Sequence, residues 1–271
     1  MNDTQHAVSE KVPFDAIYVL TSLATKDRIQ SVTSQLNDSG LADTVPVHTV
    51  FAPNSRLISH IISVLPTVEY IRKNNWAFQC TIGHYLILHD AVAREYERIL
   101  VLEDDIRLIN DRREFYRLLN RVPDDYDIAM LDWWPYYGSR GWTSGRFADY
   151  MNSHKNEVWV RWADFFVLRS SGAYMLSSKG MKTLIEIQDS CLPGSKKIFW
   201  GNILHACDEL FDNAFQNQFG LNCYVSNPII ARQPGGGHSG GGNDYLYDIQ
   251  KVSGRFDKEN YGHIENVKTV T

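Results

Sequence analysis

The segment "ERILVLEDDI", residues 97–106, decides how the rest of the chain is interpreted. Its run of aliphatic residues is typical of a buried strand, and Glu103, Asp104 and Asp105 follow that run directly. If strand geometry continues through the tip, Glu103 and Asp105 point to one side and Asp104 to the other. Two carboxylates would then share one small space, which is unfavourable unless a cation lies beside them.

Two explanations of the acidic triplet are open. Carboxylate oxygens are ligands that Mg²⁺ and Mn²⁺ prefer, and a divalent ion that also reaches a diphosphate would make the arrangement favourable. Alternatively, the acids cap the next helix, where negative charge near the amino end contributes a few tenths to about 1 kcal/mol. Because three acids exceed what one cap requires, the sequence favours metal and nucleotide binding.

Apolar runs and helical periodicities alternate on both sides of this segment. The strands and helices predicted around it are the strand 14–20, a helix ending near Gly40, the strand 45–52, the helix 82–96, a helix around 115–122 and the strand 127–134. This order predicts an α/β fold with a mostly parallel central sheet flanked by helices. In such folds ligands bind at the carboxyl ends of the strands, where the acids lie.

Composition limits the class of protein. The chain has 271 residues, 44% hydrophobic and 22% charged, as in ordinary globular proteins, which predicts one large domain or one with a small appendage. A net charge of -5 and a pI near 6.0 argue against a nucleic-acid partner. The sequence shows neither the ~18-residue apolar run of a membrane span nor a secretory signal. We therefore expect a cytoplasmic protein, and peripheral contact with the inner face of a membrane stays open.

The four cysteines show no paired metal-binding spacing. They are Cys80, Cys191, Cys207 and Cys223, and each lies in apolar surroundings. Buried free thiols are therefore expected rather than disulfides or a zinc site.

Four motifs in order resemble those of glycosyltransferase family 25, the lipooligosaccharide galactosyltransferase type, whose members have the GT-A fold. The resemblance spans most of residues 14–233, and the motifs are "IYVLTSLATKDR", "CTIGHYLILHDAV", "ILVLEDDI" and "SGAYMLSSKGMKTLI". It implies a GT-A-like, Rossmann-like domain over 1–233. The Gly-rich segment 234–271 is expected to pack on the site or close over it.

The resemblance also implies an activity. A family member of this type would transfer a hexose, with galactose expected, from a UDP-sugar to a hydroxyl of a glycan or lipid-linked glycan, with inversion, in surface polysaccharide or lipooligosaccharide synthesis. Mn²⁺ or Mg²⁺ would be held by Asp105, by Glu103 directly or through water, and by His238 as a third ligand. Asp104 would bind the ribose or sugar of the donor. A plain flexible linker explains the glycines around His238 equally well.

Other residues are expected around the donor. Thr21, Ser22 and Arg28 follow the first strand and would contact the nucleotide, although Arg28 also fits a solvated position at a helix start. Cys80 and His84 share one helix face and by resemblance line or support the donor pocket. For His84, a satisfied core residue is an equal alternative.

The catalytic base is expected in "CDELFDNAF", which offers Asp208 and Asp212 where the family has one aspartate. They are one helical turn apart, Asp208 is slightly favoured, and a solvent-facing acidic helix edge remains the alternative. Gly83 stands where the family usually has Ser, which puts a hydroxyl role there in doubt. In the aromatic loop, Trp134 is the first candidate for stacking on acceptor sugars, although aromatic residues at a strand end are more often core. The other aromatic candidates are Trp133, Tyr136, Tyr137 and Trp142.

Two further classes of function compete. A nucleotidyltransferase of related fold would also use acids and a divalent ion, but "TSLATKDR" lacks the glycines of its usual phosphate loop. A catalytically inactive carbohydrate-binding protein would keep the fold without turnover. Release of a nucleoside diphosphate in the presence of Mn²⁺ separates such a binder from a transferase.

Overall fold

The computed structural model describes residues 11–22, 26–54, 75–109, 111–135, 149–150, 152–162, 168–190 and 219–233. In chain order the elements are β1 (Ala16–Thr21), α1 (Lys26–Asp38), the 3-10 helix η1 (Leu41–Asp43), β2 (Val47–Phe51), α4 (Asn75–Ala93), β3 (Arg98–Glu103), β4 (Arg107–Leu108), α5 (Arg112–Leu119), β5 (Ile128–Met130), β6 (Trp134–Pro135), β7 (Trp159–Arg161), β8 (Leu168–Arg169), β9 (Ala173–Ser177), α7 (Ser178–Ser190), β10 (Cys223–Ser226) and β11 (Ala231–Arg232).

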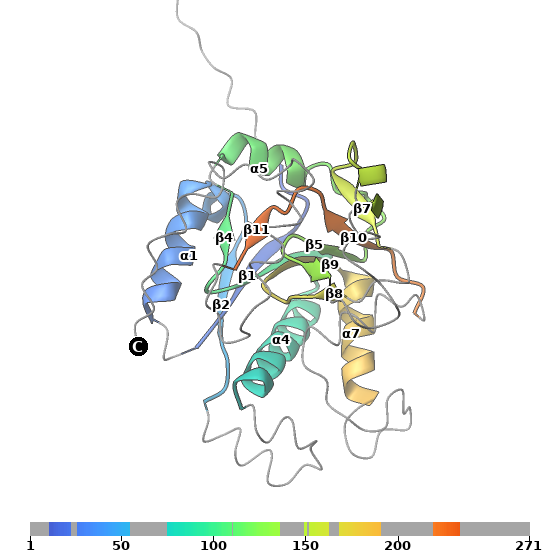
Figure 1. Ribbon diagram of the computed structural model, residues 1–271. Helices are drawn as coiled ribbons and strands as arrows, with labels where there is room; N and C mark the ends of the chain where they lie inside the picture. Colours follow the sequence, from blue (N-terminus) through green and yellow to red (C-terminus); the bar gives the residue numbers. More distant parts are fainter. Residues whose placement is uncertain are drawn as a thin grey trace, which may run out of the picture.

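A seven-stranded sheet in the order β2-β1-β3-β9-β5-β10-β7 forms the centre of the molecule (Figure 1). Five of its strands run in one direction, whereas β9 and β7 run antiparallel to their neighbours. The predicted fold class, an α/β arrangement with a mostly parallel sheet flanked by helices, is confirmed.

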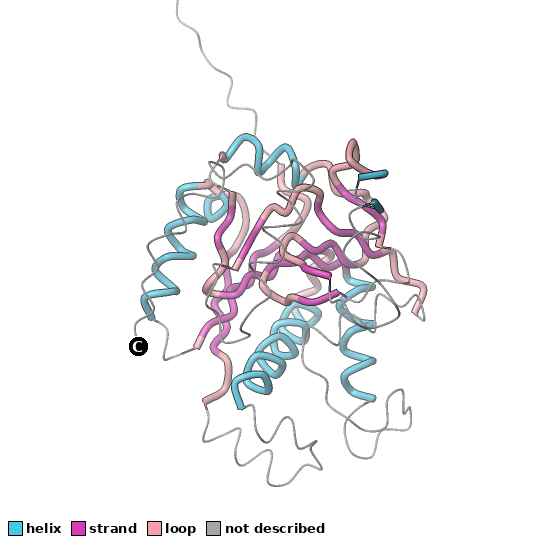
Figure 2. Tube along the Cα trace, viewed as in Figure 1, coloured by secondary structure: helices cyan, strands magenta, loops and turns pink. Residues whose placement is uncertain are grey.

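Helices cover both faces of the sheet, and the alternation of side chains along each strand explains why both faces are apolar. On β1, Tyr18 and Leu20 join the core cluster that contains buried residues of α4 and α7. Ile17 and Val19 point the other way, into the cluster that contains residues of α1 and α5. The ribbon and tube views show α4 and α7 beside each other, away from α1 and α5 (Figures 1 and 2).

Two predicted elements differ from the observed ones. The helix expected at 82–96 begins earlier, at Asn75, and ends at Ala93. The strand expected at 127–134 is divided into β5 and β6, because the chain leaves the ladder after Met130. The amides of Leu131 and Asp132 both donate to the carbonyl of Ala173, at 3.0 and 3.1 Å, instead of continuing the alternating pairing.

A short ladder positions the end of the described chain. β11 pairs antiparallel with β4, with Ala231 opposite Leu108 and Arg232 opposite Arg107. β4 follows the acidic triplet almost directly, so this pairing brings residue 233 to the carboxyl end of β3. Segments far apart in sequence therefore meet at the edge of the sheet where ligands are expected.

The described cysteines are free, as predicted: Cys223 is buried and Cys80 is partly exposed. Cys191 and Cys207 lie outside the described residues. None of the helices in the described ranges combines the length and apolar content that a membrane-spanning helix requires.

Candidate active site

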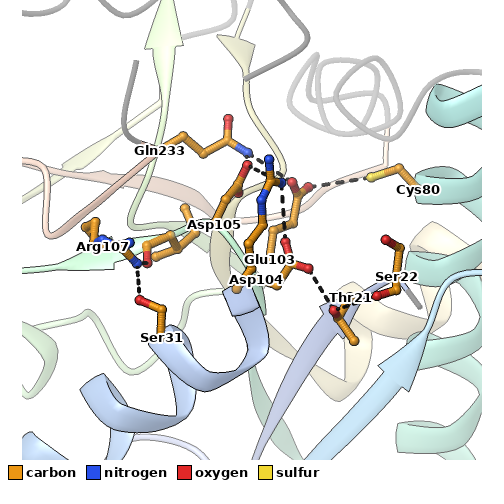
Figure 3. A network of polar contacts seen from close by, with 11 residues as sticks. Thr21, Ser22, Ser31, Cys80, Glu103, Asp104, Asp105, Arg107 and Gln233 are labelled. Atoms are coloured by element: carbon orange, nitrogen blue, oxygen red, sulfur yellow. Dashed lines mark hydrogen bonds and ion pairs between the residues drawn. The ribbon is translucent and has the colours of Figure 1, made fainter. Parts of the chain in front are cut away.

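The acidic triplet lies where β3 ends. Strand geometry stops at Glu103, whose amide still donates to the carbonyl of Gly172 at 2.8 Å, and Asp104 and Asp105 form a turn. Strand geometry therefore does not continue through Asp105. The turn nevertheless brings the carboxylates of Glu103 and Asp105 close together. Both accept a hydrogen bond from the same atom, Nε2 of Gln233, which lies 3.0 Å from Oε2 of Glu103 and 3.1 Å from Oδ1 of Asp105 (Figure 3).

The alternative that these acids cap the next helix does not fit the structure. The N-cap of α5 is Asp111, whose Oδ1 accepts a hydrogen bond from the amide of Glu114 at 3.0 Å. A cap of this type is sufficient for one helix end. Capping of α5 therefore does not explain Glu103, Asp104 and Asp105.

Glu103 is held by hydrogen bonds from three side chains. Its Oε1 accepts from the Ser171 hydroxyl at 2.7 Å and lies 3.1 Å from Nε2 of His84 and 3.6 Å from Sγ of Cys80. Burial raises the pKa of Glu103, but hydrogen bonding and charge from His84, with the bonds from Ser171 and Cys80, outweigh it and lower the pKa below its ordinary value. Glu103 is therefore anionic at neutral pH.

Cys80 and His84 lie one turn apart on α4 and face the acids, which agrees with the predicted shared face. Nδ1 of His84 lies 2.7 Å from the hydroxyl of Tyr174 on β9, so both ring nitrogens have partners. One ligand atom each from Cys80, His84 and Glu103 lie within 4.8 Å of one another, close enough to hold a metal ion. His84 is thus both buried and part of the site.

Asp104 points away from Glu103, toward the end of β1. Its Oδ2 accepts from the hydroxyl of Thr21 at 2.7 Å, and its Oδ1 lies 3.7 Å from Nη1 of Arg28. The same guanidinium nitrogen lies 3.4 Å from Oδ2 of Asp105. Because the Arg28 side chain is 44% exposed, these pairs contribute no more than about 1 kcal/mol. Ser22 lies beside Thr21 at the same strand end (Figure 3).

Among the described residues, the negative charge around Asp105 is offset by the partly exposed guanidinium of Arg28. Burial and, after it, the charge of Glu103 raise the pKa of Asp105 to about 6, while Arg28 opposes the shift. The side-chain amide of Gln233 also donates a hydrogen bond to Asp105 and so favours its charged form. Hard carboxylate oxygens that repel each other in this way fit a divalent ion such as Mg²⁺ or Mn²⁺.

A fourth acid, Asp132, was missed by the sequence reasoning. It follows β5, which is separated from β3 by β9 alone, and its Oδ2 accepts from the hydroxyl of Ser170 at 2.7 Å. Burial first, and then the charges of Glu103 and Asp105, raise the pKa of Asp132 to about 7, while the hydrogen bond from Ser170 opposes the shift. The signal was present, because Asp132 follows the apolar run "IAML" as Glu103 follows "ILVL".

Two glycines allow close packing beside the site. A Cβ on Gly83 would collide with Cδ1 of Leu20, so the space of a serine side chain at this position is filled from β1. A Cβ on Gly172 would lie 2.6 Å from Cδ1 of Ile106 and 2.7 Å from Oδ2 of Asp132. The departure from the family pattern at Gly83 thus has a packing reason.

The remaining predicted residues divide into two groups. Trp133 is a core residue: it is buried, its Nε1 donates to the carbonyl of Ser226 at 3.0 Å, and its ring packs edge to face on Trp162. Outside the described residues or side chains lie Asp208, Asp212, His238, Trp134, Tyr136, Tyr137 and Trp142. The division between 1–233 and 234–271 coincides with the end of the described chain and stays a prediction.

Comparison with known proteins gives similarity to one family. Residues 77–193 match the family model described as "Glycosyltransferase family 25 (LPS biosynthesis protein)". Procollagen galactosyltransferase 2 of Mus musculus and that of Homo sapiens are each 27% identical over 130 residues, 46% of this chain and 20% of theirs. The inactive glycosyltransferase 25 family member 3 of Mus musculus is 27% identical over 132 residues, 45% of this chain and 21% of its own. The chain thus matches about a fifth of the length of these relatives.

Solved structures give weaker similarity. A glycosyltransferase involved in the glycosylation of the major capsid of PBCV-1 aligns with a TM-score of 0.36 and 8% identity, covering 88% of this chain and all of its own. Mouse xyloside xylosyltransferase 1 aligns with a TM-score of 0.33 and 10% identity, covering 78% of this chain and 84% of its own.

Proposed function

Because residues 77–193 match the model of glycosyltransferase family 25, we propose that this protein transfers a hexose from a UDP-sugar to a hydroxyl of a glycan acceptor, with inversion. Galactose is the hexose suggested by the names of the relatives, and a role in surface polysaccharide or lipooligosaccharide synthesis is suggested by the family description. The observation that carries the proposal is the convergence of Glu103 and Asp105 at the carboxyl end of β3.

Sugar transfer requires that the departing diphosphate be neutralised. We propose that Asp105 and Glu103 hold Mn²⁺ or Mg²⁺, with His238 as a third ligand. The ion, when bound, supplies positive charge to the leaving group. The raised pKa of Asp105 supports this role, because a doubly charged ion would favour the carboxylate that burial and Glu103 now disfavour.

The chain's own side chains orient the donor in this proposal. Arg28 is partly exposed and aims its guanidinium at the acids, so it can turn to a phosphate oxygen when an ion takes over Asp105. Thr21 and Ser22 lie at the neighbouring strand end, beside Asp104, where the nucleoside or sugar hydroxyls would bind. Cys80 and His84 keep Glu103 ionised and oriented.

Transfer with inversion also needs a base to take the proton of the attacking hydroxyl. We keep Asp208 or Asp212 as the proposed base, and the segment 234–271 as a cover over the donor. Stacking of Trp134 on the acceptor is part of the same proposal. A cytoplasmic location, with peripheral contact at the inner face of a membrane left open, belongs to the same proposal.

The test is release of UDP from a panel of UDP-hexoses with the full chain and Mn²⁺. We expect hydrolysis of one donor and its loss in Asp105→Asn, a variant that conserves shape and removes the charge. Asp43→Asn changes an exposed acid of η1 and serves as the control that should retain wild-type rates. Wild-type turnover by Asp105→Asn would refute the role of the acidic site.

A carbohydrate-binding protein without turnover is the second candidate, because one relative of equal similarity is named inactive. Such a protein would bind UDP or a UDP-sugar in calorimetry but release no UDP from any donor over hours. Binding together with release excludes this alternative.

A further inference from the structure

Gln233 is placed at the acids by backbone pairing. It directly follows β11, whose ladder with β4 fixes the chain beside the turn that carries Asp104 and Asp105. Its Nε2 contacts both carboxylates proposed to hold the ion, at 3.0 Å from Glu103 and 3.1 Å from Asp105 (Figure 3). One amide group thus occupies the point where the two negative charges meet.

The chemistry of an amide suits two states of this site. The amino end donates hydrogen bonds, which is the favourable orientation toward two carboxylates without an ion. The carbonyl end is a hard oxygen ligand of the kind that Mg²⁺, Mn²⁺ and Ca²⁺ accept. Rotation about the last side-chain bond exchanges the two ends without moving the backbone, and this torsion has a broad, roughly two-fold preference.

We propose that Gln233 is a further ligand of the divalent ion, which its amide oxygen binds after the amide turns over. The inference rests on the proposed function, because it requires the ion at Glu103 and Asp105. A ligand role also explains why position 233 carries a neutral side chain beside two acids. Lysine would pair with the acids but repel a divalent ion, and a third acid would add to the repulsion between Glu103 and Asp105 when no ion is bound.

Direct binding of Mn²⁺ to the full-length chain tests the proposal without relying on turnover. Free Mn²⁺ is measured by its paramagnetic resonance signal during titration of wild type, Gln233→Ala, Gln233→Glu and the control Gln30→Ala, which changes an exposed glutamine of α1. We expect binding at least about tenfold weaker in Gln233→Ala, equal or tighter in Gln233→Glu, and unchanged in the control. Circular dichroism melts in chelator verify that each variant is folded.

The outcomes distinguish an error about Gln233 as a ligand from an error about the metal site as a whole. Wild-type or tighter binding by Gln233→Ala would overturn the inference and leave the metal site intact, because the amide would then only hold the place of the ion. Weaker binding by Gln233→Glu as well as Gln233→Ala would also overturn it, since glutamate supplies an oxygen at the same position. Absence of Mn²⁺ binding by wild type would overturn both this inference and the proposed metal role.

Discussion

Replacing Asp132 with asparagine should make the stability of the protein less sensitive to a rise in pH from 5 to 8. Asp132 is 4% exposed, and burial with the charges of Glu103 and Asp105 raises its pKa from 3.8 to about 7. A carboxyl whose pKa is raised by folding takes up its proton more readily in the folded state. The stability present below pH 3.8 is therefore lost progressively as the pH rises through about 7.

The magnitude follows from the two pKa values. At about 1.4 kcal/mol per pH unit, the full effect of Asp132 is on the order of 4 kcal/mol, of which about 2.5 kcal/mol falls between pH 5 and pH 8. Asparagine keeps the shape and still accepts from the Ser170 hydroxyl, but it does not ionise. The variant should therefore lose about 2.5 kcal/mol less stability than wild type over this range.

Urea unfolding of both proteins at pH 5 and pH 8, in chelator, measures the two differences in free energy of unfolding. Comparing the differences cancels any constant cost of the substitution and the titration of other groups common to both proteins. If wild type and Asp132→Asn lose equal stability between pH 5 and pH 8, Asp132 is not a buried carboxylate with a raised pKa. The packing described around Ser170 and Gly172 would then be incorrect.

Two further substitutions probe packing beside the site. His84→Phe removes partners of Glu103 and Tyr174 and should lower the free energy of unfolding at pH 7 by about 1–3 kcal/mol; unchanged stability in urea would contradict these hydrogen bonds. Gly83→Ala should cost about 1–3 kcal/mol because its Cβ meets Leu20. Adding Leu20→Val should recover part of that loss, and strictly additive costs would show that the two residues do not touch.

The sequence was sufficient to predict the elements that carry strong local patterns. The apolar runs of β1 and β3 and the helical repeat of α4 are visible within a few residues, and the acids at the end of β3 stand out by charge. The antiparallel direction of β9 was not predictable in this way. Its pairing with β3 and β5 depends on tertiary packing, and an apolar run reads the same in either direction.

The site was predicted in part: the acids at the end of β3 were found, whereas Asp132, Gln233 and Ser171 were missed. Glu103 and Asp105 were recognised as a pair, but Gln233 is 130 and 128 residues away from them and stands directly after Arg232, with no pattern that marks it. Ser171, 68 residues from Glu103, is equally inconspicuous. Such partners are brought together by strand pairing, which leaves no local spacing to detect.

The insertion of β9 between β3 and β5 also bears on how the chain is made. Residues 173–177 complete the open side of β3, whose other side is paired with β1 early in the sequence. Until these residues have been synthesised and have left the ribosome, the edge of β3 stays unpaired and can pair with a strand of another nascent chain. Fragments that stop before residue 173 should therefore aggregate, whereas those that include β9 bury that edge.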